Sequence, residues 1–302
     1  MLGLLLLSPA AVVAADEGAA FLTLGAGARP AAMGGAWTAV ADDVNSAFWN
    51  PAGLARLERN EFQFSHREAV AGIRYETVGV ARRMARGAFA ATASYLGQPS
   101  LSGRDELGAP TGAFNAYDLS AGVHYARNLP FLPGTGFGAG IRYIRSRIAE
   151  ASAQTVAADL GAQWQAARSF GPGTPSLGLA VRNLGPGLRF LDQSSSLPLT
   201  MSVGLGYRLP QGLLADADFI SRPNADLNGF AAGLEYALYR SFFMRAGYSS
   251  IAAQTSGGGV SGALSGFTAG FGVKLTDWTM DYAMTPMGEL GPAQNFSLGA
   301  RF

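Results

Sequence analysis

From Arg59 to the end of the chain, apolar residues alternate with small or polar residues in a series of short segments. In residues 201–208, for example, Met, Val, Leu and Tyr alternate with Ser, Gly, Gly and Arg. Successive side chains of a β-strand point to opposite faces, so each segment predicts a strand with one apolar and one polar or small face. We count 14 such segments, which begin near Glu61, Tyr75, Gly87, Ala116, Gly136, Thr155, Ser176, Thr200, Leu213, Gly229, Ser241, Gly266, Trp278 and Gln294.

Two architectures show this alternation, and they differ in whether the apolar face of the strands points inward or outward. A soluble sandwich turns its apolar face inward, whereas a transmembrane barrel turns it towards lipid. Hydrophobic residues make up 48% of the 302-residue chain and charged residues 14%, against about 25% charged in soluble proteins. No stretch of about 20 apolar residues offers a transmembrane helix instead. The low charge and the Gly and Ala opposite the apolar face therefore favour the barrel.

The lengths of the connections indicate an even number of strands. Bacterial barrels have short periplasmic turns and longer loops outside. If both ends of the barrel are periplasmic, the long connections 97–115, 184–197, 250–265 and 285–293 all lie outside, and the short ones 82–86, 209–212, 239–240 and 276–277 all lie inside. We therefore expect residues 59–302 to form a monomeric, antiparallel transmembrane β-barrel of about 14 strands in the bacterial outer membrane.

The first 58 residues have a different character. Residues 1–15 form a short apolar run that ends in small residues before Asp16, which predicts a secretory signal peptide cleaved after Ala15. The positively charged start of such peptides is missing, so a truncated start and another role both stay open. Residues 16–58 are rich in Ala and Gly without sustained alternation. We expect them to form short helical turns that fill the lumen, because strand side chains alone do not fill a barrel of this size.

Two features indicate where those helical turns begin. Asp42 or Asp43 can cap a short helix that runs through Phe48. Asn50 then provides an N-cap, and Pro51 follows as a first helical residue.

The polar face of the predicted strands carries charges of both signs. A selective pore would favour one sign, whereas mixed charges predict pairing across the lumen and with residues 16–58, where Arg29, Asp42 and Asp43 are candidates. The predicted lumen-facing charges are Asp118, Arg142, Asp159, Arg182, Arg208, Asp216, Asp218, Glu235, Arg245, Lys274, Asp281 and Arg301.

The sequence offers little for catalysis, metals or cofactors. There is no cysteine, and His66 and His124 are the two histidines. Ser120 shares a strand face with His124 but lies about 13 Å away along the strand, beyond hydrogen-bonding distance. Asp42 and Asp43 have no nearby His or Cys, and the N-terminal glycines lack the context of a phosphate loop. We expect no enzyme, no metal and no cofactor, and the net charge of +1 gives no reason to expect nucleic acid.

Residues 24–52 read LGAGARPAAMGGAWTAVADDVNSAFWNPA. The ordered elements in and just after this stretch are Gly34-Gly35-Ala36, Ala41-Asp42-Asp43 and Asn50-Pro51-Ala52-Gly53. The pattern resembles the N-terminal region of the PorV/PorQ family of outer-membrane proteins, within the wider FadL-like superfamily of outer-membrane transporters. The segments 182–186 and 196–198 are similar to that family as well.

The resemblance implies a barrel of fourteen strands whose N-terminal hatch plugs the lumen. In the FadL branch the cargo is hydrophobic and leaves sideways through an opening made by a kinked strand. In the PorV branch the barrel serves type IX secretion by binding the C-terminal signal domains of exported proteins. The hatch motif favours carriage of a hydrophobic or amphipathic small molecule. A secretion adaptor and a mainly structural barrel are the alternatives.

The expected partners follow from these readings. Outer-membrane lipids surround the barrel, and Phe302, with apolar residues at two-residue spacing before it, resembles the C-terminal signature read by the barrel-assembly machinery. Secretion subunits or exported proteins would contact the outer loops 97–115 and 250–265. The run Leu188-Arg189-Phe190-Leu191 is predicted to be an exposed apolar cluster in another outer loop.

Overall fold

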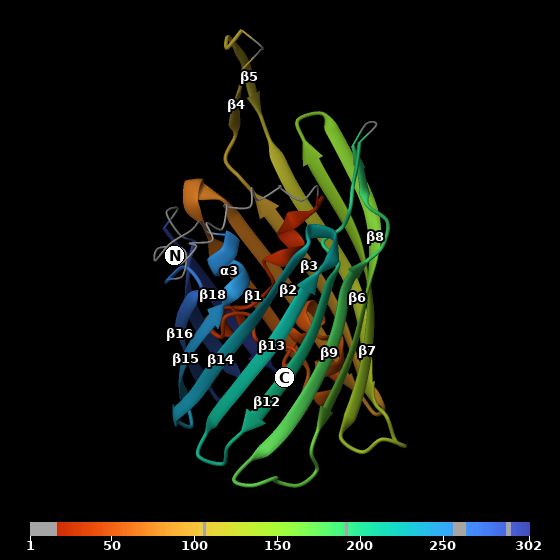
Figure 1. The fold of residues 1–302 in the computed structure, drawn as a ribbon, viewed down its shortest axis with the longest axis vertical. Coiled ribbons are helices and arrows are strands. Elements are labelled where there is room, and N and C mark those ends of the chain that lie inside the picture. Colours follow the sequence, from red (N-terminus) through yellow and green to blue (C-terminus); the bar gives the residue numbers. More distant parts are fainter. Residues whose placement is uncertain (1–16, 105–106, 191–192, 256–263, 288–290) are drawn as a thin grey trace, which may run out of the picture.

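The computed structural model describes residues 17–104, 107–190, 193–255, 264–287 and 291–302, so the predicted signal peptide lies outside the described residues. A closed antiparallel barrel of 14 strands dominates the structure (Figure 1). Each strand pairs with its neighbours along the chain, and the first pairs with the last. The barrel strands are β1 (Glu61–Glu68), β2 (Arg74–Met84), β3 (Gly87–Gly97), β6 (Ala116–Asn128), β7 (Thr135–Ile148), β8 (Ala151–Gln165), β9 (Thr174–Leu184), β12 (Thr200–Arg208), β13 (Leu213–Arg222), β14 (Leu227–Tyr239), β15 (Phe242–Ser249), β16 (Phe267–Leu275), β17 (Trp278–Pro286) and β18 (Pro292–Arg301).

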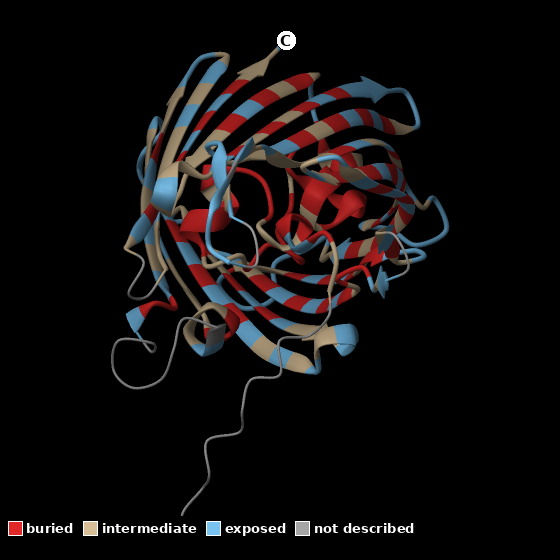
Figure 2. Cartoon of the chain, turned by 90° about the horizontal axis from the view of Figure 1, so that it is seen from above, coloured by how far each residue is buried: buried red, intermediate tan, exposed pale blue. Residues whose placement is uncertain are grey.

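The two faces of the strands point as a membrane barrel requires. In β12, Met201, Val203 and Leu205 are 45%, 51% and 62% exposed on the outside, whereas Ser202 is buried on the inside. The same banding of exposed and buried residues runs around the wall (Figure 2). Since a soluble sandwich would bury its large apolar side chains, the structure confirms the barrel.

The predicted strands correspond one to one to the barrel strands. The largest shift of a start is in β8, which begins at Ala151 rather than Thr155 because only residues 149–150 separate it from β7. We call the end of the barrel with the short turns the turn end, and the opposite end the loop end.

The loops at the loop end contain elements that the sequence did not predict. They are the hairpin of β4 (Leu101–Arg104) and β5 (Pro110–Phe114), the hairpin of β10 (Leu188–Phe190) and β11 (Gln193–Ser195), the helix α3 (Ser250–Thr255), and the short turns η3 (Val70–Gly72) and η4 (Pro223–Ala225).

The prediction of an exposed apolar cluster at residues 188–191 is wrong for its first residue. Leu188 is 0% exposed and packs in one cluster with Phe21, Ile144 and Leu197. The hairpin of β10 and β11 therefore folds towards the lumen and covers the N-terminal residues. Phe190 is half-buried against the same cluster, and Leu191 lies outside the described residues.

Residues 17–58, which we call the inner segment, lie inside the ring of strands (Figure 2). Their short helices contact opposite parts of the wall: α1 (Ala28–Ala32) packs against β15 to β18, and η2 (Pro51–Arg56) packs against β3 and β6 to β8. The other two helices are η1 (Ala20–Thr23) and α2 (Ser46–Trp49). In the described part of the chain, no helix has the length and apolar character needed to cross a membrane.

One of the two predicted helix starts is confirmed. The side chain of Asn50 accepts a hydrogen bond from the backbone N–H of Ala52, and Pro51 is the first residue of η2. The other helix start lies later than predicted, because α2 begins after Asn45 and no side chain caps it there. Asp43 instead accepts from the backbone N–H of Asn45, and Asp42 forms ion pairs.

Glycines on the inner face of the wall let the inner segment approach the strands closely. A Cβ atom on Gly178 of β9 would lie 2.1 Å from the carbonyl oxygen of Thr38, and one on Gly247 of β15 would lie 2.1 Å from the carbonyl carbon of Met33. Both distances are far below van der Waals contact. Some of the small residues opposite the apolar face, such as these two glycines, are therefore sites where the backbone of the inner segment touches the wall.

Two irregularities interrupt the pairing of the described barrel strands. One lies between Ala237 and Tyr239 of β14, and the other between Ala158 and Leu160 where β8 meets β9. At the second, Asn183 adopts a positive φ of 62°, so β9 carries an extra residue opposite Asp159, as in a β-bulge. Strand β3 pairs without interruption with both β2 and β6.

Candidate functional site

A cavity of about 980 Å³ lies inside the loop end of the barrel, above the inner segment. Much of its lining is apolar and comes from widely separated parts of the chain. These apolar residues include Phe21, Leu24, Trp49, Val70, Ile73, Tyr75, Leu96, Ile220, Ile251 and Met287. This size and character fall in the range of pockets that bind small molecules.

The cavity also has a polar part in which positive charge prevails. Arg67, Arg182 and Arg222 line it together with Asp118. Arg182 donates to the carbonyl oxygen of Phe48 at 3.0 Å and lies over the ring of Trp49 at 5.3 Å. The Nε atoms of Arg182 and Arg222 are buried and have no hydrogen-bond partner among the described residues. Buried donors of this kind are usually satisfied, so these two nitrogens mark a place for an acceptor.

Residues of the N-terminal motif at 24–53 form part of the floor of the cavity. Gly34 and Gly35 line it, with positive φ values of 69° and 78° that favour glycine. A Cβ atom on Gly34 would lie 2.6 Å from the backbone nitrogen of Tyr248. Trp49, also in the floor, donates its Nε1–H to the carbonyl oxygen of Ala26 at 2.8 Å.

The second part of the motif holds the inner segment to the wall below the cavity. Asn50 is 0% exposed and donates to the carbonyl oxygens of Thr38 at 2.7 Å and of Ala162, on β8, at 3.2 Å. Pro51, Ala52 and Gly53 are buried in η2, which packs against the same side of the wall.

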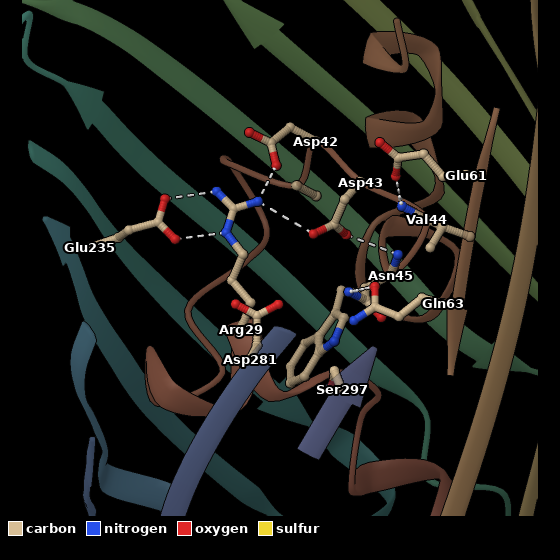
Figure 3. A network of polar contacts seen from close by, with 12 residues as sticks. Arg29, Asp42, Asp43, Val44, Asn45, Glu61, Gln63, Glu235, Asp281 and Ser297 are labelled. Atoms are coloured by element: carbon tan, nitrogen blue, oxygen red, sulfur yellow. Dashed lines mark hydrogen bonds and ion pairs between the residues drawn. The ribbon is translucent and has the colours of Figure 1, made fainter. Parts of the chain in front are cut away.

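A network of charges lies between the cavity and the turn end (Figure 3). Arg29 of the inner segment donates from Nε and Nη2 to the two carboxylate oxygens of Glu235 at 2.7 and 2.8 Å. Its Nη1 atom donates to Asp42 at 2.7 Å and to Asp43 at 3.3 Å. On the wall, Arg245 pairs with Glu235 at 2.6 Å and with Asp281 at 2.7 Å.

The carboxyl group of Asp43, which belongs to the inner segment, has a pKa that its surroundings raise. Burial raises the pKa of Asp43 to about 6, the guanidinium of Arg29 opposes that shift, and the neighbouring Asp42 adds to it. Asp42 also pairs with Arg208 at the turn end, at 3.1 Å. Arg29 thus joins two elements of the inner segment to the strands around them.

Other predicted lumen charges lie in separate places. Asp218 accepts from the backbone N–H groups of Trp37 and Thr38 at 2.9 and 3.0 Å, and Asp216 is buried on the same face of β13. Arg142 pairs with Asp159 at 2.6 Å at the bulge of β9. Arg301 pairs with Glu61 at 2.9 Å near the turn end, where Lys274 is half-buried.

Several contacts between the wall and the inner segment were not predicted from the sequence. Glu61 accepts from the backbone N–H of Val44 at 2.9 Å, Ser297 accepts from that of Ala28 at 2.7 Å, and Thr268 donates to the carbonyl of Ala32 at 2.9 Å. All three wall residues belong to predicted strands, so alternation could have marked them as lumen-facing. Their partners depend on how the inner segment folds, which alternation does not report.

The described residues contain no group of three or more His, Asp or Glu side chains placed to hold a metal ion. His124 is buried and its Nε2 lies 3.0 Å from the hydroxyl of Thr92, on the neighbouring strand. This arrangement is that of a packed lumen residue.

Comparison with known sequences places the chain in a family. Residues 13–204 match the model of the uncharacterised protein family UPF0164. The chain belongs to this family. A relative, the UPF0164 protein of Treponema pallidum (strain Nichols), is 29% identical over 203 residues, which cover 60% of this chain and 46% of the relative. The match therefore spans less than half of the relative's length.

Comparison with solved structures identifies the fold. The chain is similar to the toluene transporter TodX of Pseudomonas putida, with a TM-score of 0.62 and 12% identity over 91% of this chain and 96% of that one. It is similar to the toluene transporter TbuX of Ralstonia pickettii, with a TM-score of 0.63 and 14% identity over 92% and 98%. A FadL homologue of Pseudomonas aeruginosa gives a TM-score of 0.55 and 14% identity over 92% and 97%. The FadL-like barrel expected from the sequence is thus confirmed as the fold of this UPF0164 protein.

Proposed function

We propose that this protein is a non-catalytic barrel of the bacterial outer membrane that carries a hydrophobic or amphipathic small molecule inward. The loop end faces the outside and the turn end faces the periplasm. The cavity of about 980 Å³ carries the proposal, because its apolar lining offers a small molecule a binding place inside the wall. The fold shared with two toluene transporters supports this assignment.

The outer surface supports a place in the membrane. Apolar side chains such as Leu205, Leu179 and Val123 are 62%, 54% and 64% exposed on the outer face of the strands. In water these side chains would be a large exposed apolar surface, whereas in a bilayer they face lipid.

The polar part of the cavity bears on the cargo. Arg67, Arg182 and Arg222 outnumber Asp118 there, and two of the guanidinium groups have a nitrogen without a partner among the described residues. A buried cation needs a counter-charge or an acceptor. The cavity therefore suits an apolar molecule with one anionic or hydrogen-bond-accepting group better than a plain hydrocarbon.

A binding measurement with a filled cavity tests the proposal. Ile220→Trp adds volume inside the cavity, whereas Ile141→Trp makes the same change on the lipid-facing side of β7, where Ile141 is 60% exposed. Equilibrium dialysis of labelled dodecanoate, dodecanol and dodecane against the detergent-solubilised protein should show saturable binding that Ile220→Trp weakens and Ile141→Trp does not. Equal binding by both variants would contradict a cargo site in this cavity.

We propose further that residues 16–58 are a hatch that keeps the lumen closed to ions beneath the bound cargo. The network around Arg29 and the contacts of Asn50 hold this segment to opposite parts of the wall. A planar bilayer measurement tests the seal. The purified protein should show far less conductance than an open porin, and porin-like conductance would refute the closed hatch.

A second candidate function is that of a secretion adaptor of the PorV/PorQ type. The hairpin of β4 and β5 rises above the barrel at the loop end (Figure 1), and Leu107 near its tip is 94% exposed. This hairpin, which stands clear of the barrel, would be the part that contacts a protein partner. A pull-down from native membranes, with wild-type protein and with the hairpin replaced by a short Gly-Ser turn, should recover exported proteins or secretion subunits only with the wild type.

A further inference from the structure

A second, smaller cavity lies at the turn end of the barrel, away from the cargo cavity. It measures about 450 Å³ and lies where β2, β3 and β6 end beside the chain that leaves the lumen. Its lining combines arginines with apolar residues, among them Leu57, Arg83, Met84, Arg86, Arg127 and Pro130.

Positive charge is concentrated at this place. Arg82 and Arg83 lie just before the end of strand β2, Arg86 lies in the turn to β3, and Arg127 lies near the end of β6. In the described part of the chain none of the four forms an ion pair, and Arg83 donates instead to the carbonyl oxygen of Glu58 at 2.9 Å. Arg59, at the same end, is paired with Asp277 at 2.6 Å. Neighbouring cations without counter-charges repel one another, so the cluster suits an anion.

The outer surface next to the cavity has the features of a membrane interface. Phe89 and Tyr125 pair across β3 and β6 with ring centroids 4.6 Å apart, and Arg82 is the partner of Phe89 across β2 and β3. Met84 and Phe89 are 46% and 50% exposed. Aromatic residues at the ends of membrane strands lie at the level of the lipid headgroups. The arginines are therefore at the height of the lipid phosphates.

We propose that this cavity binds the phosphodiester headgroup of an anionic phospholipid in the periplasmic leaflet. Arg86 and Arg127 hold the phosphate oxygens, because the planar guanidinium presents paired N–H donors that match them. The acyl chains lie along Met84, Phe89 and Tyr125 on the outer face. This lipid-facing apolar surface beside the charges favours a lipid over an acidic protein. The inference rests on the membrane placement proposed above and not on the identity of the cargo.

Native mass spectrometry with a matched pair of variants tests the site. Arg86→Gln with Arg127→Gln removes two cations that line the cavity, whereas Arg168→Gln with Arg240→Gln removes two exposed arginines outside that lining, in turns of the same end. The detergent-solubilised proteins are titrated with phosphatidylglycerol, phosphatidylcholine and glycerol 3-phosphate. We expect wild type and the control to bind phosphatidylglycerol well above phosphatidylcholine, and the cavity variant to bind it at least about tenfold more weakly.

Several outcomes would overturn the proposal. They are an equal loss of binding in both double variants, unchanged binding in the cavity variant, and equal binding of the two lipids by wild type. Glycerol 3-phosphate that competes as well as the lipid would reassign the site to a free phosphate compound.

Insertion into vesicles is measured separately, so that a failure of the headgroup site can be told apart from a failure of the membrane placement. Both double variants should insert into phosphatidylcholine vesicles like wild type, as shown by the mobility of the folded barrel on unheated gels. If Arg127→Gln impairs folding, Arg86→Gln alone, in an exposed turn, repeats the comparison. A wild-type protein that inserts into no vesicle would refute the membrane placement, whereas insertion with unchanged phosphatidylglycerol binding in the cavity variant refutes only the headgroup site.

Discussion

Replacing Arg29 with glutamine should loosen the inner segment and open the lumen to ions. The Arg29 side chain is 15% exposed and forms its closest contacts with Glu235, which is 5% exposed, and Asp42. Removing one partner from a buried ion pair costs about 3–5 kcal/mol, since the remaining charge stays uncompensated. Glu235 keeps Arg245 and Asp42 keeps Arg208. We therefore expect the lower limit, a loss of about 3 kcal/mol in the free energy of unfolding.

Urea unfolding in detergent, followed by gel mobility, measures this loss, and planar bilayers report the conductance. The matched control is Arg59→Gln, which breaks an exposed pair with Asp277 whose side chains are 49% and 47% exposed. Exposed pairs contribute about 1 kcal/mol or less, so this variant should stay close to wild type in both assays. Equal losses of stability in the two variants, or wild-type conductance in Arg29→Gln, would refute the assignment of Arg29 as the link that holds the hatch closed.

Three further predictions follow from contacts described above. Gly178→Val places a side chain where a Cβ already meets the carbonyl oxygen of Thr38 at 2.1 Å, so the same urea assay should show a loss of about 1–3 kcal/mol, the usual result of overpacking; wild-type stability would mean that the inner segment does not touch β9 there. Asp43 has a pKa raised from 3.8 to about 6, so the folded state holds its proton more tightly than the unfolded state, and its contribution to stability is present below about pH 4 and is lost as the pH rises to about 6. Asp43→Asn should lose that part of the pH dependence, which urea midpoints measured across this range would detect, and an unchanged profile would contradict the shift. Phe302→Ala keeps the backbone pairing of Phe302 with Asn60 but removes the terminal aromatic ring, and should lower the amount of folded barrel in outer-membrane fractions if the assembly machinery reads that ring.

The strands were predictable because their signal is local. Alternation needs only the residues of one strand. The lengths of the connections along the chain then indicate that the number of strands is even and which end of the barrel each strand runs towards. The β-bulge at Asn183 and the hairpin of β4 and β5 were not predictable in this way. They depend on contacts with neighbouring strands or on pairing within a loop rich in polar residues.

The candidate site was predictable only in part. Alternation places Glu235 and Asp218 on the polar face of their strands, but it does not report that one meets Arg29 and the other meets Thr38, which are 206 and 180 residues away. The cavity at the loop end draws on loops whose folding no local pattern describes. Leu188 is a further example. An apolar run in a loop is compatible with exposure or with burial, and Leu188 is buried because it packs in one cluster with Phe21.

The contacts of α1 link the start of the inner segment to the last strands of the barrel. Ala28 binds Ser297, and α1 rests on β15 to β18, the last strands to be made. The contacts of α1 therefore form only once the final strands are in place. The backbone of Phe302 pairs with that of Asn60, directly after the inner segment ends, and β18 closes the ring on β1. The same last strands therefore both close the wall and hold α1 in place.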